Sequence, residues 1–77
     1  MFKNLIEYIH DNKLKIIASK KEVNIINFKE ILGFDEKQII IASNEAIITI
    51  SGNNLIINKL LDNEVLIIGE IEKIDME

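Results

Sequence analysis

The sequence contains no cysteine, proline, tryptophan or arginine, and its 77 residues include three glycines and one histidine. Without cysteine the chain has neither a disulfide nor a thiolate metal site to stabilise it. A chain of this length forms one small domain, whose stability is marginal unless its core is dense or a partner covers part of it. Because cysteine is missing and no signal-peptide pattern occurs, we expect a cytoplasmic protein.

The apolar content is high, and it comes mainly from isoleucine. Apolar residues make up 48% of the chain, and 19 residues are Ile. This content excludes a disordered chain. No apolar run approaches the ~18 residues of a membrane span, so we expect no transmembrane segment. An excess of Ile, Asn and Lys without Arg is also typical of an AT-rich genome.

The net charge of −4 is unevenly distributed. Residues 1–21 carry five Lys and two acidic residues, whereas residues 22–77 carry four Lys and eleven acidic residues. An acidic body without arginine repels phosphates, so we expect no nucleic-acid partner. The basic cluster consists of Lys13, Lys15, Lys20 and Lys21. We interpret it as a solvated edge that blocks aggregation, and contact with an anionic membrane surface is the alternative.

The first twelve residues differ from the rest. Phe2, Leu5, Ile6 and Ile9 follow the spacing of one apolar helix face, which predicts an N-terminal helix over residues 1–12. A helix this short is stable only when its apolar face docks on the rest of the protein. The alternative is a segment that becomes ordered upon binding a partner.

Residues 13–77 carry a β pattern and are expected to form one β-sheet domain. The predicted strands are Lys13–Ala18, Glu22–Ile26, Glu30–Phe34, Gln38–Ala42, Ala46–Ser51, Leu55–Leu60 and Glu64–Ile74. The connections between them are short and polar, which favours antiparallel neighbours. The predicted fold is therefore mainly β, with a short N-terminal helix followed by an antiparallel β-meander of six or seven strands. A small β-solenoid is the less favoured alternative, because the connections are typical of hairpin turns.

Each glycine has an expected structural reason. Gly52 lies in Ser51-Gly52-Asn53-Asn54, which we interpret as a hairpin turn with positive φ at Gly52. Gly33 and Gly69 lie within apolar strands, where a bulge or a close approach of another backbone is the usual cause.

The central strands are apolar on both faces. In Ile39-Ile40-Ile41 successive side chains point to opposite faces, and similar runs recur in later strands. Either the sheet curls into a barrel or sandwich, or its second face is buried against another chain, which we favour. With Ile39, Ile41, Ile48 and Ile57 facing the core, the candidate self-association face is Ile40, Ile47, Ile56 and Ile68. A register slip of one residue would exchange the two sets.

No pattern of catalytic or metal-binding residues occurs. His10 is the only histidine, and no serine or threonine has a second histidine to act as its base. Glu70 and Glu72 share a strand face, where we interpret them as charges that repel other strands. The sequence also lacks phosphate-binding and calcium-binding loops. We therefore expect no enzyme, no metal and no cofactor.

Several stretches beyond Val23 carry a family pattern. The most distinctive are Ile50-Ser51-Gly52-Asn53-Asn54-Leu55-Ile56-Ile57 and Ile67-Ile68-Gly69-Glu70-Ile71-Glu72-Lys73-Ile74. With Val23–Phe28, Ile31–Phe34 and Gln38–Ile41, they resemble the YabP/YqfC family of small sporulation proteins from endospore-forming Firmicutes. The chain departs from the family at Asn44-Glu45, where a glycine is common, which leaves the type of that turn open.

The resemblance implies a non-enzymatic sporulation protein of the mother cell, at the forespore surface, linked to spore coat or forespore-envelope assembly. It supplies no catalytic residues. The expected partners are a second copy of the chain and an unidentified sporulation protein. The alternative is a small β-barrel-like module that binds an apolar ligand.

We predict that His10→Ala leaves the function intact, because no second ligand or nucleophile is present for this imidazole to serve. A sporulation assay of the variant measures this. Loss of function with an intact fold would contradict it and restore a catalytic or metal-binding role.

Overall fold

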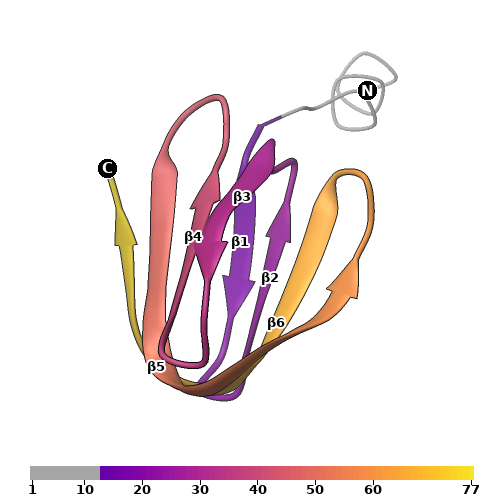
Figure 1. Ribbon diagram of the computed structural model, residues 1–77. Helices are drawn as coiled ribbons and strands as arrows, with labels where there is room; N and C mark the ends of the chain where they lie inside the picture. The colour runs from indigo at the N-terminus through magenta and orange to yellow at the C-terminus, as the bar shows by residue number, and fades with distance from the viewer. Residues whose placement is uncertain (1–12) are drawn as a thin grey trace, which may run out of the picture.

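The computed structural model describes residues 13–77, which form one six-stranded antiparallel sheet (Figure 1). The strands are β1 (Lys15–Ala18), β2 (Glu22–Ile26), β3 (Glu30–Phe34), β4 (Gln38–Ala42), β5 (Ile47–Leu60) and β6 (Glu64–Met76). The prediction of a mainly β, antiparallel fold is confirmed. Residues 13–77 contain no helix, and the predicted helix over residues 1–12 lies outside the described residues.

The strand order is β1-β2-β6-β5-β4-β3, so the predicted meander is only partly correct. β3 to β6 follow one another as a meander, but β2 pairs with β6 instead of β3. The connection from β2 to β3 contains Asn27 at a φ of 69°, in the left-handed region that asparagine tolerates. This connection leads the chain away from β2 before β3 begins, so the two strands do not pair.

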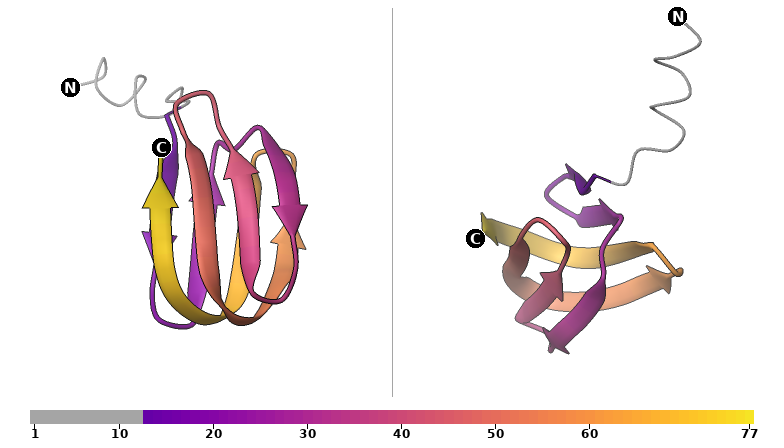
Figure 2. Two further views of the ribbon diagram at one scale, coloured as in Figure 1. Left: turned by 60° about the vertical axis from the view of Figure 1, so that its left-hand side comes forward. Right: turned by 90° about the horizontal axis from the view of Figure 1, so that it is seen from above.

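Residues 47–60 form one long strand where the sequence predicted two strands and a turn. The predicted hairpin at Gly52 is wrong, and so is its positive φ, because positive φ occurs instead at Asn54 (55°) and Gly69 (143°). β5 and β6 pair over almost their whole length, with three shifts of register between Ser51 and Lys59. These irregularities let both strands bend sharply while remaining paired (Figures 1 and 2).

The bend folds the sheet into two layers. One layer contains β3, β4, the first half of β5 and the second half of β6, and the other contains the second half of β5, the first half of β6, β2 and β1. The layers face each other through fully buried side chains, which are Ile39, Ile41, Ile48 and Ile50 from the first layer and Val23, Ile25, Val65 and Ile67 from the second. The sheet therefore covers its inner face by folding on itself. The predicted core residues Ile39, Ile41 and Ile48 are fully buried. The fourth, Ile57, is half-buried.

Gly52 and Gly69 permit the close backbone approach at the bend. A Cβ atom on Gly52 would overlap the carbonyl oxygen of Glu70, and one on Gly69 would lie 2.7 Å from the carbonyl oxygen of Asn54. The amide of Gly52 donates to the carbonyl of Lys37 (3.0 Å), and that of Gly69 donates to the carbonyl of Lys21 (3.0 Å). The β3–β4 and β1–β2 turns are thereby tied to the bend from the two layers.

Four other predicted connections are confirmed as four-residue hairpin turns, at residues 19–22, 35–38, 43–46 and 61–64. In three of them the first side chain accepts from the backbone amides two and three residues later. These residues are Ser19, Asp35 and Ser43, and the Asp35 carboxylate makes the shortest bonds, at 2.7 and 2.8 Å. Serine and aspartate hold tight turns in this way, so the sequence defines each turn locally.

We predict that Gly52→Ala lowers the unfolding free energy by about 2 kcal/mol, because the methyl group forces two paired strands apart. In a domain of this size that lowers the melting temperature by about 10 °C. Gly33→Ala is the matched control, since a Cβ there meets nothing within 4 Å, and its effect should stay within about 0.5 kcal/mol. Equal effects in thermal unfolding would contradict this explanation of the bend.

Candidate interaction surface

The four residues of the candidate self-association face lie on two different outer faces. Ile40 lies on the outer side of β4, where it pairs with Thr49 of β5. Ile47 lies on the same side of the first half of β5, where it pairs with Ala42. Ile56 and Ile68 form a direct cross-strand pair beyond the bend, in the other layer. The structure therefore separates the set into two pairs, because the bend turns the halves of β5 into opposite layers.

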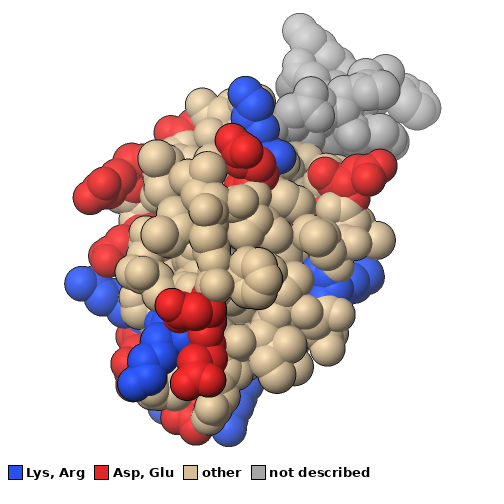
Figure 3. Space-filling model, in the orientation of Figure 1, with Lys and Arg blue, Asp and Glu red and all other residues tan. Residues whose placement is uncertain are grey.

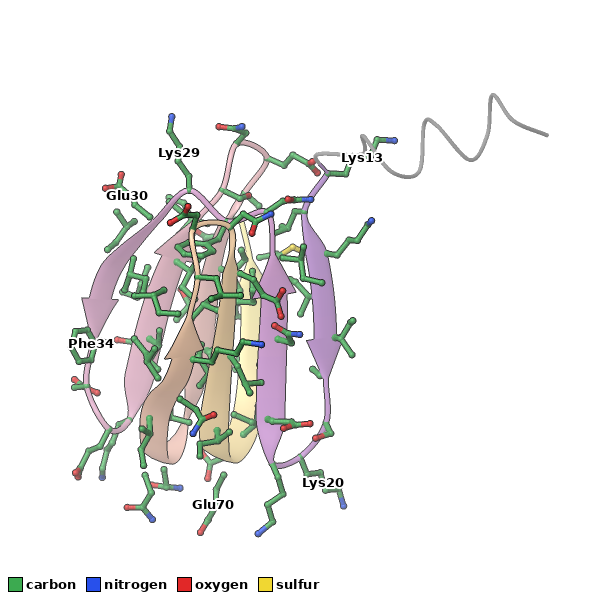
Figure 4. All side chains as sticks on the ribbon, turned by 90° about the vertical axis from the view of Figure 1, so that its right-hand side faces the viewer. Lys13, Lys20, Lys29, Glu30, Phe34 and Glu70 are labelled. Carbon is green, nitrogen blue, oxygen red and sulfur yellow. The ribbon has the colours of Figure 1, made fainter. Side chains whose placement is uncertain are left out.

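The outer face of the second layer combines apolar and polar residues (Figure 4). Ile56 is 57% exposed, and its partner Ile68 is half-buried. Asn24 lies on the same face, where its amide nitrogen donates to the Glu64 carboxylate at 3.1 Å. The amide oxygen of Asn24 is buried without a hydrogen-bond partner among the described residues.

An apolar groove of about 740 Å³ lies between β3 and the second half of β5. Its lining residues are Ile31, Leu32, Gly33, Phe34, Leu55, Ile56, Ile57 and Leu60, none of which is charged. The side chains of Leu32 (51%), Phe34 (70%), Ile56 (57%) and Leu60 (56%) are exposed, and together we call them the groove rim. Figure 3 shows an uncharged area at the centre of this side of the molecule.

The groove exists because two strand edges have no strand partner within residues 13–77, although the Leu55 amide of β5 donates to the Glu36 carbonyl of the β3–β4 turn at 2.8 Å. β3 pairs with β4 alone, and the second half of β5 pairs with β6 alone. A register shift between Ile31 and Gly33 makes Leu32 an additional residue in β3, as in a β-bulge. Phe34 lies at the free edge of β3 (Figure 4). The two layers are therefore open to solvent along this side.

Of the four groove-rim residues, Ile56 alone belongs to the predicted self-association face, and Leu32, Phe34 and Leu60 were not predicted. A signal was present in Ile31-Leu32-Gly33-Phe34, where apolar residues follow one another without the polar alternation of a solvated strand. Leu32 and Phe34 lie on the same groove as Leu60 because the bend brings β3 opposite the second half of β5.

The described polar residues that were singled out from the sequence lie apart from the groove, and His10 lies outside the described residues. Glu70 is exposed opposite Asn53, and the Glu72 carboxylate accepts from the Asn53 amide at 3.0 Å. Lys20 and Lys21 occupy the β1–β2 turn at the same end as Glu70 (Figure 4). Over residues 13–77, no group of three His, Cys, Asp or Glu side chains is arranged to hold a metal ion. The described part of the chain contains no helix, and therefore none that could span a membrane.

Comparison with known proteins identifies the family. The model of the YabP family matches residues 10–77. The chain belongs to the YabP family. The match includes all six strands and both glycines of the bend, so the family that the sequence resemblance predicted is confirmed. No curated protein and no solved structure matches the chain significantly.

We predict that Ile56→Lys leaves this YabP-family protein folded, with an unfolding free energy within about 1 kcal/mol of the wild type, because the side chain is exposed. Ile67→Lys is the matched variant on the inner face, where burial is complete, and it should prevent folding. Far-ultraviolet circular dichroism and urea unfolding measure both. If Ile56→Lys also failed to fold, the assignment of inner and outer faces would be wrong.

Proposed function

We propose that the protein is a non-enzymatic structural or adaptor module in the assembly of the spore coat or the forespore envelope. Membership of the YabP family suggests a sporulation-related protein. In this proposal the chain acts in the cytoplasm of the mother cell, at the forespore surface. It works by associating with itself and with another sporulation protein.

The observation that carries the proposal is the exposure of large apolar side chains on a well-packed sheet. Eight of them are exposed within residues 13–77, and four form the groove rim. At roughly 100 Å² for each of these four side chains, the rim exposes about 400 Å² of apolar surface. A patch of that size equals the largest apolar patch of a typical soluble monomer, which is often functional.

Charge favours a protein partner over a nucleic acid. β2 to β6 and the turns between them belong to the acidic part of the sequence, residues 22–77, which repels phosphates. The groove itself has no charged lining, so its contacts are apolar. Apolar contact surrounded by charged residues is the usual composition of a protein–protein interface.

The groove also supports a second candidate function, the binding of an apolar ligand. Its volume of about 740 Å³ lies within the range of small-molecule pockets, which span about 300–1,000 Å³. Such pockets bury most of their ligand, whereas the rim of this groove is exposed on both sides. Titration of the folded protein with a fluorescent fatty acid distinguishes the two, since saturable one-to-one binding by a monomer favours the ligand.

Deletion of the gene in the organism that encodes it tests the proposed function. We predict at least a tenfold loss of heat-resistant spores, with vegetative growth unchanged, and restoration by the wild-type gene. Complementation with Phe34→Lys should fail, because the change places a charge on the groove rim. The control Ile17→Lys should complement, because this exposed side chain lies on β1, away from the groove. A deletion strain that forms normal spores would overturn the proposal.

A further inference from the structure

We infer that two copies of the chain associate through the groove between β3 and β5, with their β3 strands antiparallel about a twofold axis at Leu32. The inference rests on the self-association in the proposed function and specifies its surface. Three observations on this side of the molecule carry it: free strand edges, an apolar rim with a projecting aromatic residue, and the order of charges along β3.

The two strands that border the groove both have an edge without a strand partner in the described part of the chain. Unpaired backbone groups at such edges pair readily with another strand. β3 is short, with five residues, and its bulge at Leu32 interrupts a regular ladder. Contact through β3 therefore depends mainly on side chains.

A symmetric interface requires a groove and a projecting group on the same surface patch, and this side of the molecule has both. Phe34 projects from the edge of β3 with 70% of its surface exposed, beside a groove lined by Ile31, Leu55 and Ile57. A twofold axis through Leu32 lets each Phe34 pack into the groove of the other copy. Both aromatic residues are buried at once, because in a twofold dimer the same patch serves as donor and acceptor of the contact.

The charges along β3 select the antiparallel arrangement. Lys29 and Glu30 lie at one end of β3 and Phe34 at the other, followed by Asp35 (Figure 4). Antiparallel pairing centred on Leu32 places each Lys29 opposite Asp35 of the other copy. Parallel pairing places Lys29 opposite Lys29, and a shift of one residue places Glu30 opposite Asp35. Opposite charges across strands stabilise the pair, and like charges destabilise it.

The apolar area of the two groove rims supplies about two-thirds of the ~1,200 Å² at the lower end of specific interfaces. The two groove rims contribute about 800 Å² of apolar surface at roughly 100 Å² per side chain. The charged residues at both ends of β3 add to this and bring the total toward the ~1,200 Å² at the lower end of specific interfaces. We therefore expect a dimer with a dissociation constant in the micromolar range, as is typical of small transient interfaces.

Cross-linking of a single introduced cysteine tests the position of the axis, since the natural chain has none. Residue 32 meets its own copy at the axis, within the Cα separation of about 4.4–6.8 Å that a disulfide requires. Oxidation of Leu32→Cys should convert most of the protein to a covalent dimer on a non-reducing gel. Ile17→Cys is the matched control, with similar exposure on β1, and should remain monomeric. Equal cross-linking of the two, or none at residue 32, would overturn the inference.

Analytical ultracentrifugation tests the contacts themselves. Phe34→Lys and Lys29→Glu should each weaken dimerisation at least tenfold, whereas Ile17→Lys should not change it. Asp35→Asn keeps an oxygen acceptor for the turn amides of Lys37 and Gln38 while it removes the charge. The effect of Lys29→Glu should therefore be smaller in the Asp35→Asn background.

Three outcomes would overturn the inference while leaving a sporulation role standing. They are a wild-type monomer at 100 µM, a dimer that Phe34→Lys does not weaken, and a monomer that binds a fatty acid in the groove. A deletion strain with normal sporulation would instead overturn the proposed function, whatever the dimer does.

Discussion

The close approach of two backbones at Gly52 and Gly69 is the constraint on which the rest of the structure depends. At these positions β5 and β6 bend together, and a Cβ atom on either residue would collide with the facing strand. The bend converts one sheet into two layers with a single core of valine, isoleucine and leucine. The amides of Gly52 and Gly69 at the bend donate to the carbonyls of the two outer turns, so the hairpins β1–β2 and β3–β4 keep their places in the layers.

The same bend explains why the molecule has an apolar groove. When one sheet folds into two layers, the strands at the edges of each layer lack a neighbour unless the layers close into a barrel. Here β3 and the second half of β5 remain unpaired to each other, and the side chains between them reach solvent. The groove is thus a consequence of incomplete closure, and in the dimer that we propose a second copy of the chain covers it.

The candidate surface illustrates how far a strand pattern can locate an interface. Alternation within strands correctly separated Ile39, Ile41 and Ile48 from Ile40 and Ile56, since neighbouring side chains must point to opposite faces. The prediction from the strand pattern placed Ile40 and Ile56 on one surface, because alternation alone does not show where a sheet bends. The bend places them on different layers, so the predicted face of four isoleucines does not exist as one patch.

The sequence by itself determined the local features of this protein, which are the strands, four hairpin turns and the inward-facing residues. Ser19, Asp35 and Ser43 hold their turns through bonds to amides two and three residues away, and such contacts depend only on neighbouring residues. Tertiary structure alone decided the pairing of β2 with β6, the continuity of β5 through Gly52 and the groove. Each of these depends on which distant strands bury their apolar faces against each other, and hydrophobic burial is non-directional, so a strand pattern does not specify the partner.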